Sequence, residues 1–263
     1  MRNLFFIGLL SFISFKLSAG DEFCGIHNTT FKSEEKIDYT IYYSVIGIYV
    51  NAGTASFSTK LEKLGKVDTY HLLGIGNSNP SYDWIFKVRD KYESFIDTNN
   101  LRPQKFNRNI DEGGFQQVES VTFNSEKNTA TTLKGTVNIP ACVQDVLSSI
   151  YYARNIDYNK FKPNDKIPFS MYLDNNVYEL YIKYLGKETI KTKYGTFNAI
   201  KFKPLLVKGT IFTGGEKMSV WVTDDANHVP VRIESPITVG TIKVDMMGFS
   251  NLKYPMTALI SRR

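Results

Sequence analysis

The sequence predicts an all-β fold, mainly antiparallel: a strongly curved sheet, an open barrel or a β-roll, with one or two short helices packed against it. Three observations predict this class. Apolar and polar residues alternate with period two in segment after segment, as in strands with one buried face. β-Branched and aromatic residues dominate these segments, and 14% of the chain is aromatic. Short stretches rich in glycine and aspartate separate them, as hairpin turns do.

The first strand is predicted over residues 37–45, where every second residue is isoleucine, tyrosine or valine. Residues 51–53, Asn-Ala-Gly, are expected to break it before a second extended segment over residues 54–61. A turn at residues 63–66 then leads into a third strand over residues 67–73. The Gly-Ile-Gly stretch at residues 74–76 is expected to be a turn, because it lacks the third glycine and the helix start of a phosphate-binding loop.

The same alternation recurs in the second half of the chain, over residues 178–184, 218–222 and 229–233. Residues 224–227, Asp-Asp-Ala-Asn, suit a hairpin loop between the last two of these strands, and the Asp-Glu-Gly-Gly stretch at residues 111–114 marks another hairpin.

Two stretches predict helices instead. Residues 80–88 suit a short helix with Asn79 as its cap and Pro80 at its first position. Over residues 143–154, apolar residues recur at three- and four-residue spacing, which predicts an amphipathic helix of about three turns. Asp145 and Arg154, early and late in this helix, complement its dipole, so we expect structural roles for both.

The first twenty residues have the pattern of a secretory signal peptide: Arg2, an apolar run over residues 4–15 that is too short to span a membrane, and small residues before Asp21. We therefore expect a signal peptide at residues 1–20 and a single β-rich domain at residues 21–263, exported to the periplasm or cell envelope. No lipobox is present, since Asp21 stands where a lipoprotein has its cysteine. No later segment is long and apolar enough to span a membrane.

Cys24 and Cys142 are the two cysteines of the chain. In an oxidising compartment an isolated pair is readable as one disulfide, and two buried free thiols are the alternative.

The sequence shows no arrangement of histidine, serine or carboxylate residues that is typical of a catalytic or metal site. His27, His71 and His228 lie far apart, and no zinc or serine-hydrolase motif occurs, so we expect no metal and no cofactor. The formal net charge of +6 is spread along the chain, which argues against nucleic-acid binding. Carboxylates on separate strands, among them Asp90, Asp97, Asp145 and Glu179, could serve a hydrolase of envelope polymers, but the sequence selects no catalytic pair.

The sixteen tyrosines concentrate on the predicted strands and on the longer helix. One reading is core packing, in which tyrosine buries its ring while its hydroxyl finds a partner. The other is a concave aromatic surface that binds an amphipathic or glycan ligand without catalysis. For that site we select Tyr151 and Tyr152, with Tyr43 and Trp221. A structural partner within an envelope complex is a further alternative.

Several motifs together resemble one family. They are the following: residues 35–39 (Glu-Lys-Ile-Asp-Tyr), 51–55 (Asn-Ala-Gly-Thr-Ala), 90–94 (Asp-Lys-Tyr-Glu-Ser), 101–103 (Leu-Arg-Pro), 142–154 (Cys-Val-Gln-Asp-Val-Leu-Ser-Ser-Ile-Tyr-Tyr-Ala-Arg), 195–197 (Gly-Thr-Phe), 221–225 (Trp-Val-Thr-Asp-Asp) and 230–232 (Pro-Val-Arg). The chain resembles the exported Gram-negative proteins known as the domain of unknown function 3108 family. The resemblance implies a β-rich envelope protein and supplies no catalytic residues.

Overall fold

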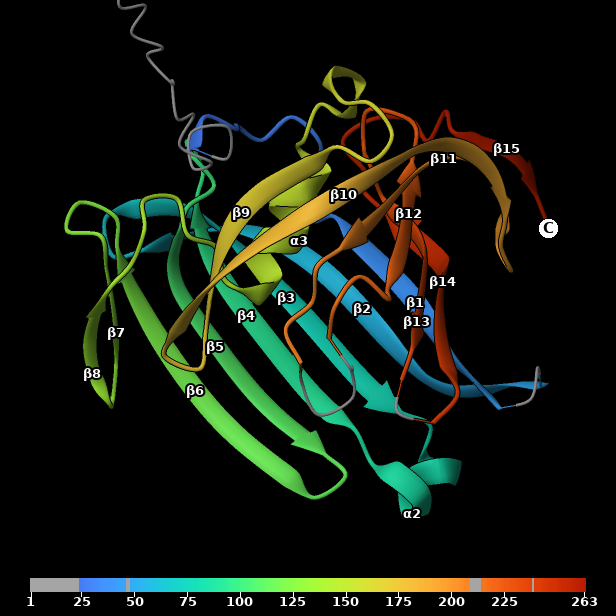
Figure 1. The fold of residues 1–263 in the computed structure, drawn as a ribbon, viewed down its shortest axis with the longest axis horizontal. Helices are drawn as coiled ribbons and strands as arrows, with labels where there is room; N and C mark the ends of the chain where they lie inside the picture. The colour runs from blue at the N-terminus through green and yellow to red at the C-terminus, as the bar shows by residue number, and fades with distance from the viewer. Residues whose placement is uncertain (1–23, 46–47, 209–213, 238) are drawn as a thin grey trace, which may run out of the picture.

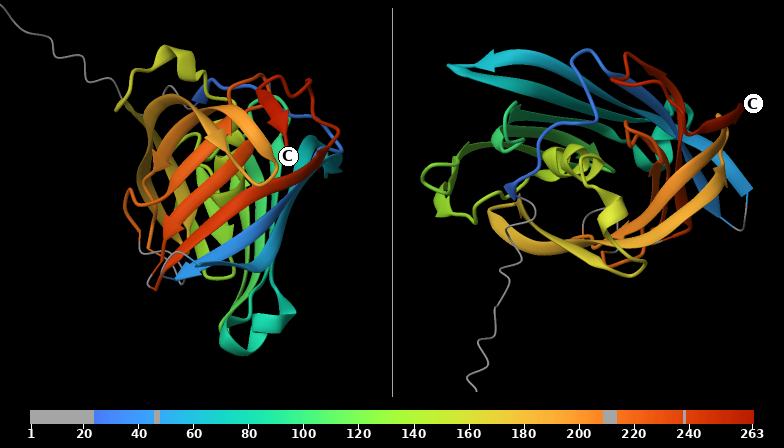
Figure 2. Two further views of the ribbon diagram at one scale, coloured as in Figure 1. Left: turned by 90° about the vertical axis from the view of Figure 1, so that its right-hand side faces the viewer. Right: turned by 90° about the horizontal axis from the view of Figure 1, so that it is seen from above.

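The computed structural model describes residues 24–45, 48–208, 214–237 and 239–263, so the expected signal peptide lies outside the described residues. Within these ranges fifteen strands form one antiparallel sheet, ordered β8-β7-β6-β5-β4-β3-β2-β1-β14-β13-β12-β11-β10-β9, with β15 paired to β11 beside this path. The sheet curls around a helix, and its two end strands, β8 and β9, do not pair with each other (Figures 1 and 2). The predicted all-β, strongly curved and open architecture is confirmed.

The first eight strands form a meander in chain order, in which each strand pairs with the next. They are β1 (Lys36–Val45), β2 (Ile48–Leu64), β3 (Val67–Ser78), β4 (Arg89–Asp97), β5 (Pro103–Glu112), β6 (Phe115–Asn124), β7 (Thr129–Thr132) and β8 (Gly135–Asn138). The predicted hairpin at residues 111–114 joins β5 to β6, with Gly113 and Gly114 at positive φ in its turn.

Strands β9 to β14 form a second meander, β15 pairs with β11 beside it, and β14 pairs with β1 to join the two halves. They are β9 (Lys166–Leu173), β10 (Asn176–Lys191), β11 (Gly195–Pro204), β12 (Ser219–Thr223), β13 (Pro230–Pro236), β14 (Thr241–Ser250) and β15 (Leu259–Arg262). The β1–β14 pairing connects residues about two hundred positions apart, which no local pattern predicts.

Both predicted helices are present. The turn η1 (Pro80–Tyr82) and helix α2 (Asp83–Phe86) follow Asn79, whose side-chain oxygen accepts a hydrogen bond from the Ser81 N–H at 3.1 Å. The longer helix α3 (Val146–Arg154) begins three residues later than predicted and is followed by the turn η2 (Tyr158–Lys160). Gln144 is extended instead and exchanges backbone hydrogen bonds of 2.8 and 2.9 Å with β9.

Residues 51–53 do not break the chain, as the sequence had predicted, but lie inside the long strand β2. The register between β1 and β2 shifts at this point, which is the mark of a β-bulge. A Cβ atom on Gly53 would lie 2.3 Å from the Asn77 carbonyl oxygen of β3. Glycine is therefore used here for close backbone approach within a strand.

Residues 74–76, predicted to be a turn, lie within β3. Gly74 provides space for packing: a Cβ atom there would lie 3.1 Å from the Phe57 ring and 3.5 Å from a methyl carbon of Leu147. Because Leu147 belongs to α3, this contact shows that α3 lies over β3. We call the face of the sheet on which α3 lies the inner face, and the opposite one the outer face.

The largest core cluster fills the space between α3 and the inner face, with β3 and β4 on one side of the helix and β9 on the other (Figure 2). Leu72, Ile96 and Phe169 contribute to it from these three strands. Burial of such large apolar side chains stabilises the fold by roughly 1.5–3 kcal/mol each. Helix α3 lies towards one end of the curved sheet (Figure 1), and some apolar side chains of the inner face, such as Ile41 and Val244, are only half-buried.

Candidate functional site

The tyrosines selected from the sequence lie in the core around α3. Tyr151 and Tyr152 are 2% and 1% exposed. The ring of Tyr151 meets Phe31 edge-on at 4.9 Å, and burial raises the pKa of Tyr152 to about 12. Two side chains so deeply covered hold the helix in place. These two tyrosines therefore do not form the exposed aromatic surface that the sequence predicted.

Trp221 and Tyr43 do not join them in one surface. Val220 and Val222 belong to the core cluster around α3, so Trp221, between them in β12, points to the outer face. There its indole N–H donates to Glu188 at 2.6 Å, and the Lys201 ammonium lies 4.8 Å from its ring. Tyr43 is half-buried near the end of β1.

Asp145 caps α3. Its side chain accepts hydrogen bonds from the Leu147 and Ser148 N–H groups, both at 2.8 Å, and the Ser148 hydroxyl accepts one from the Asp145 N–H in return. The Ser94 hydroxyl of β4 donates to the same carboxylate at 2.6 Å. Burial raises the pKa of Asp145 to about 6 despite these donors. The arrangement anchors the helix N-terminus to the sheet.

Arg154, at the other end of α3, is paired with Glu35. Its guanidinium donates to both carboxylate oxygens, at 2.6 and 3.0 Å, and also to the Asn227 carbonyl oxygen at 3.0 and 3.2 Å. Both charged side chains are almost fully buried. Sequence reasoning did not select Glu35, since the two residues lie 119 positions apart and only the fold brings them together.

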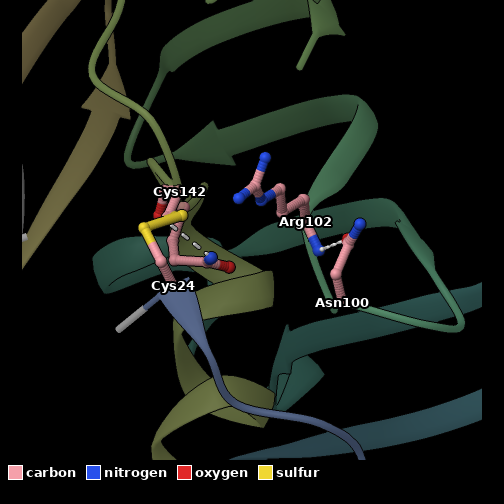
Figure 3. The surroundings of a disulfide bond; sticks show 5 residues. Cys24, Asn100, Arg102 and Cys142 are labelled. Atoms are coloured by element: carbon pink, nitrogen blue, oxygen red, sulfur yellow. Dashed lines mark hydrogen bonds between the residues drawn. A yellow bond between two sulfur atoms is a disulfide. The ribbon is translucent and has the colours of Figure 1, made fainter. Parts of the chain in front are cut away.

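Cys24 and Cys142 form a disulfide that spans 118 residues. It joins the first described residue to the segment just before α3, beside Arg102 and Asn100 in the β4–β5 connection (Figure 3). The N-terminal segment then continues over α3, where the Thr29 N–H donates to the Asn155 side chain at 2.6 Å.

The less covered part of the inner face carries an apolar row across six strands. Successive register partners in this row are Ile41 (β1), Val244 (β14), Ile233 (β13), Val220 (β12), Phe202 (β11) and Tyr184 (β10). The last three are buried in the core around α3, which places the whole row on the inner face. The first three are only half-buried. We call these three, Ile41, Val244 and Ile233, the open row.

A polar group lies across the inner face from the open row, on β4, β5 and β6. Asp90 and Glu112 are hydrogen-bonded to each other, and burial raises the pKa of both carboxyl groups, that of Glu112 to about 7. Arg108 lies 2.8 Å from Glu119 and also pairs with Asp174 of the β9–β10 turn. We call these five residues the carboxylate cluster.

Small residues lie between the carboxylate cluster and Tyr39, the inner-face residue of β1 that precedes Ile41 of the open row and pairs with Ala55. Ala55 on β2 pairs with Gly76 on β3, and Gly76 pairs with Asp90. A Cβ atom on Gly76 would meet nothing closer than Asp90, at 3.9 Å. The inner face thus carries the apolar open row on one side and partly buried carboxyl groups on the other, with a strip formed by Ala55 and Gly76 between them. Such an arrangement can accept a molecule with one apolar and one polar end.

The raised pKa of Glu112 predicts a pH dependence of stability. Folded Glu112 holds its proton up to about pH 7, whereas the unfolded group releases it near its ordinary value of 4.5. The folded state therefore binds more protons between these values, and the free energy of unfolding falls as pH rises through this window. We expect Glu112→Gln to remove this contribution, as measured by urea unfolding at several pH values between 4.5 and 7.5.

Asp111 supplies the control. The hydrogen bond from Lys87 lowers the pKa of the Asp111 carboxyl, so its contribution has the opposite sign and is lost as pH falls. Asp111→Asn should leave the fall between pH 4.5 and 7 in place. Parallel pH profiles for wild type and Glu112→Gln would contradict the assignment.

Two shallow depressions of about 360 Å³ each lie over β1, β2 and β3, and Ala55 is the one residue of the open row, the strip and the carboxylate cluster that lines either of them. They adjoin at Thr54 and Asn77, which face outward on β2 and β3, and polar side chains such as Thr40 and Ser56 line them. None of the four residues selected from the sequence lines either depression.

Among the described residues, no group of three or more histidine, cysteine, aspartate or glutamate side chains is placed to hold a metal ion. In the same part of the chain, no helix has the length and apolar character needed to cross a membrane.

Comparison with known proteins places the chain in a family. No curated protein sequence matches it. The crystal structure of a β-barrel-like protein with domain of unknown function 1849 from Brucella abortus is similar in fold, with a TM-score of 0.56 at 7% identity, and covers 84% of this chain and 99% of that one.

Two further solved structures match more loosely. One is a presumed lipoprotein from Parabacteroides distasonis, with a TM-score of 0.35 at 16% identity over 85% of this chain and 100% of that one. The other is a presumed exported protein with a YmcC-like fold from Bacteroides fragilis, with a TM-score of 0.33 at 13% identity over 86% of this chain and 99% of that one. The family model described as "protein of unknown function (DUF3108)" matches residues 38–247, and the chain therefore belongs to this family.

Proposed function

We propose that this protein is exported and binds an amphipathic ligand on the open part of its inner face, without catalysis. The observation that carries the proposal is the open row: apolar side chains continuous with the core, yet only half-buried. Concave sites for small molecules combine such apolar surface with a few polar groups. The leader-like first twenty residues and the Cys24–Cys142 disulfide support export, since disulfides persist in oxidising compartments.

The apolar open row and the polar carboxylate cluster together predict how the ligand is oriented. The apolar part of the ligand lies along the open row, and its polar end lies near the carboxylate cluster, across the strip formed by Ala55 and Gly76. With Glu112 holding a proton up to about pH 7, this cluster can both donate and accept hydrogen bonds. A ligand with a hydroxyl or ammonium group at its polar end fits these groups best.

The test is a titration of the mature protein with a fluorescent long-chain alcohol, whose hydroxyl group matches the proposed polar end of the ligand. We expect Ile41→Ser to weaken binding by about ten-fold, because a lost apolar contact of this size is worth roughly 1.5 kcal/mol. Tyr42→Ser is the matched control: Tyr42 is the next residue of β1, is also half-buried and faces outward. Equal affinity of Ile41→Ser and wild type would overturn the proposal. Native mass spectrometry of the protein purified from its own envelope gives a second test, and the absence of any bound small molecule would overturn the proposal too.

A second candidate function, hydrolysis of an envelope polymer, is favoured by one observation. Asp90 and Glu112 share a hydrogen bond, and a carboxylic acid with a pKa of about 7 is a suitable general acid. Glycosidases, however, hold their two carboxyl groups about 5–9.5 Å apart, and a directly hydrogen-bonded pair is closer than that. Release of soluble fragments from purified envelope polymers, abolished in Glu112→Gln, would favour hydrolysis over binding.

A further inference from the structure

Four large apolar side chains are exposed together at one tip of the molecule. Trp84, Ile85 and Phe86 form most of α2, and Phe115 begins β6 on the neighbouring hairpin. Trp84 is 83% exposed, although it is among the largest apolar side chains of the protein. Helix α2 projects beyond the ends of the strands that carry it (Figures 1 and 2). We call these four residues the apolar tip.

The apolar tip is held in a fixed shape by the sheet. The Phe86 ring lies over Gly113 of the β5–β6 turn, where a Cβ atom would come within 2.2 Å of it. The Gly113 N–H donates to the Lys87 carbonyl oxygen at 2.8 Å, which ties the end of α2 to this turn. The tip is therefore presented by two connected hairpins, and docking it costs little conformational entropy.

The polar groups next to the apolar tip already have partners within the protein. The Trp84 indole N–H donates to the Ser81 carbonyl oxygen at 3.1 Å. Asp83 pairs with Arg89 at 2.6 Å, and Lys87 with Asp111 at 2.8 Å. Moving the tip out of water would leave none of these groups without a hydrogen-bond partner, which removes the main cost of entering an apolar medium.

We propose that the apolar tip docks this protein onto the surface of a lipid bilayer. A convex apolar projection suits insertion among lipid chains, and tryptophan is favoured at the boundary between headgroups and hydrocarbon. Positive charge can add to this attraction. Lys208 lies after β11 and Lys217 before β12; both are exposed, and neither forms an ion pair with a described residue. They complement the negative charge of anionic lipids, at about 1 kcal/mol per residue near the surface.

Docking in this way would turn the open part of the inner face toward the bilayer. The end of β1 and the start of β2, like the end of β13 and the start of β14, lie towards the same end of the sheet as α2 (Figure 1). Ile48, the first residue of β2, and Val239, just before β14, are exposed. An amphipathic ligand could then pass between the bilayer and the open row without crossing water. The docking itself does not depend on a ligand and stands or falls separately from the proposed function.

The experiment is co-sedimentation of the mature protein with vesicles of phosphatidylethanolamine and phosphatidylglycerol. We expect the wild type to bind and the double variant Trp84→Ser/Ile85→Ser to bind at least about ten-fold more weakly, since two apolar insertions are lost. Val118→Ser is the matched control, because Val118 is 79% exposed and lies on the opposite face of β6 from Phe115. Lys208→Glu/Lys217→Glu should weaken binding to these vesicles more than to phosphatidylcholine vesicles.

Tryptophan fluorescence gives a second readout that a misfolded variant cannot mimic. The chain has two tryptophans, and Trp221 is buried, so quenching by brominated lipids should report Trp84 alone. We expect quenching in the wild type and Val118→Ser and none in Trp84→Ser. Wild type that stays in the supernatant, or a double variant that sediments as the wild type does, would overturn the proposal. The affinity for the fluorescent long-chain alcohol, measured without vesicles, should be the same in Trp84→Ser/Ile85→Ser and wild type, which separates this test from that of the proposed function.

Discussion

Glu35→Gln is expected to lower the free energy of unfolding by about 3–5 kcal/mol, because it leaves the Arg154 charge buried without its counter-ion. The Arg154 guanidinium makes both of its short carboxylate contacts with Glu35, at 2.6 and 3.0 Å. Its other partners, the Asn227 carbonyl oxygen and the rings of Tyr151 at 5.3 Å and Phe31 at 5.6 Å, are neutral and cannot replace the charge. Urea unfolding followed by fluorescence measures the change.

The adjacent Glu34 gives a control of the same chemistry. Glu34 is exposed, so Glu34→Gln should stay within about 0.5 kcal/mol of wild type. The double variant Glu35→Gln/Arg154→Met should lose less than the sum of the two single losses, since it removes both buried charges. Equal stability of Glu35→Gln and Glu34→Gln would show that the pair does not support the fold.

Removal of the Cys24–Cys142 disulfide is expected to cost about 4–5 kcal/mol in the chain-entropy model, because the bridge closes a loop of more than a hundred residues in the unfolded chain. The bond also holds the N-terminal segment against α3, where Phe31 meets the Tyr151 ring. We expect a reductant to lower the urea midpoint of the wild type by the same amount as Cys24→Ser/Cys142→Ser does without it.

The double cysteine variant is also the control for the reductant, since its midpoint should not respond to one. Thiol titration of the denatured, unreduced wild type should find no free thiol. Two free thiols, together with a midpoint that reductant leaves unchanged, would contradict the bridge.

Features that depend on neighbouring residues were predictable from the sequence. Strand periodicity located β1, β10 and β13, because alternate side chains of a half-buried strand meet opposite environments. The Asn79 cap of η1 was predictable as well, since capping involves groups only two or three positions away. Glycines misled the same reasoning twice. At Gly53 and Gly74 the absence of a side chain serves packing against β3 and α3 inside long strands.

The burial of Tyr151 and Tyr152 on α3 shows why the proposed binding surface could not be predicted from sequence periodicity. Helical periodicity separates Tyr151 from Tyr152 and places them on different faces, yet both are buried. A helix enclosed by a curved sheet is covered by β3 and β4 on one side and β9 on another, so one apolar stripe does not describe it. Tyr151 and Tyr152 therefore lie in the core, and the half-buried apolar side chains of the inner face are those of the open row on β1, β13 and β14.

The sequence by itself determined the all-β class, six of the fifteen described strands, the turns at residues 63–66, 111–114 and 224–227, the Asn79 cap and the family, because each depends on local pattern or motif. The tertiary structure alone decided the β1–β14 closure, the Glu35–Arg154 pair, the Asp90–Glu112 contact and the exposure of Trp84. Each of these depends on which distant segments meet when the sheet curls, and on which they leave uncovered. Sequence spacing carries no information about either.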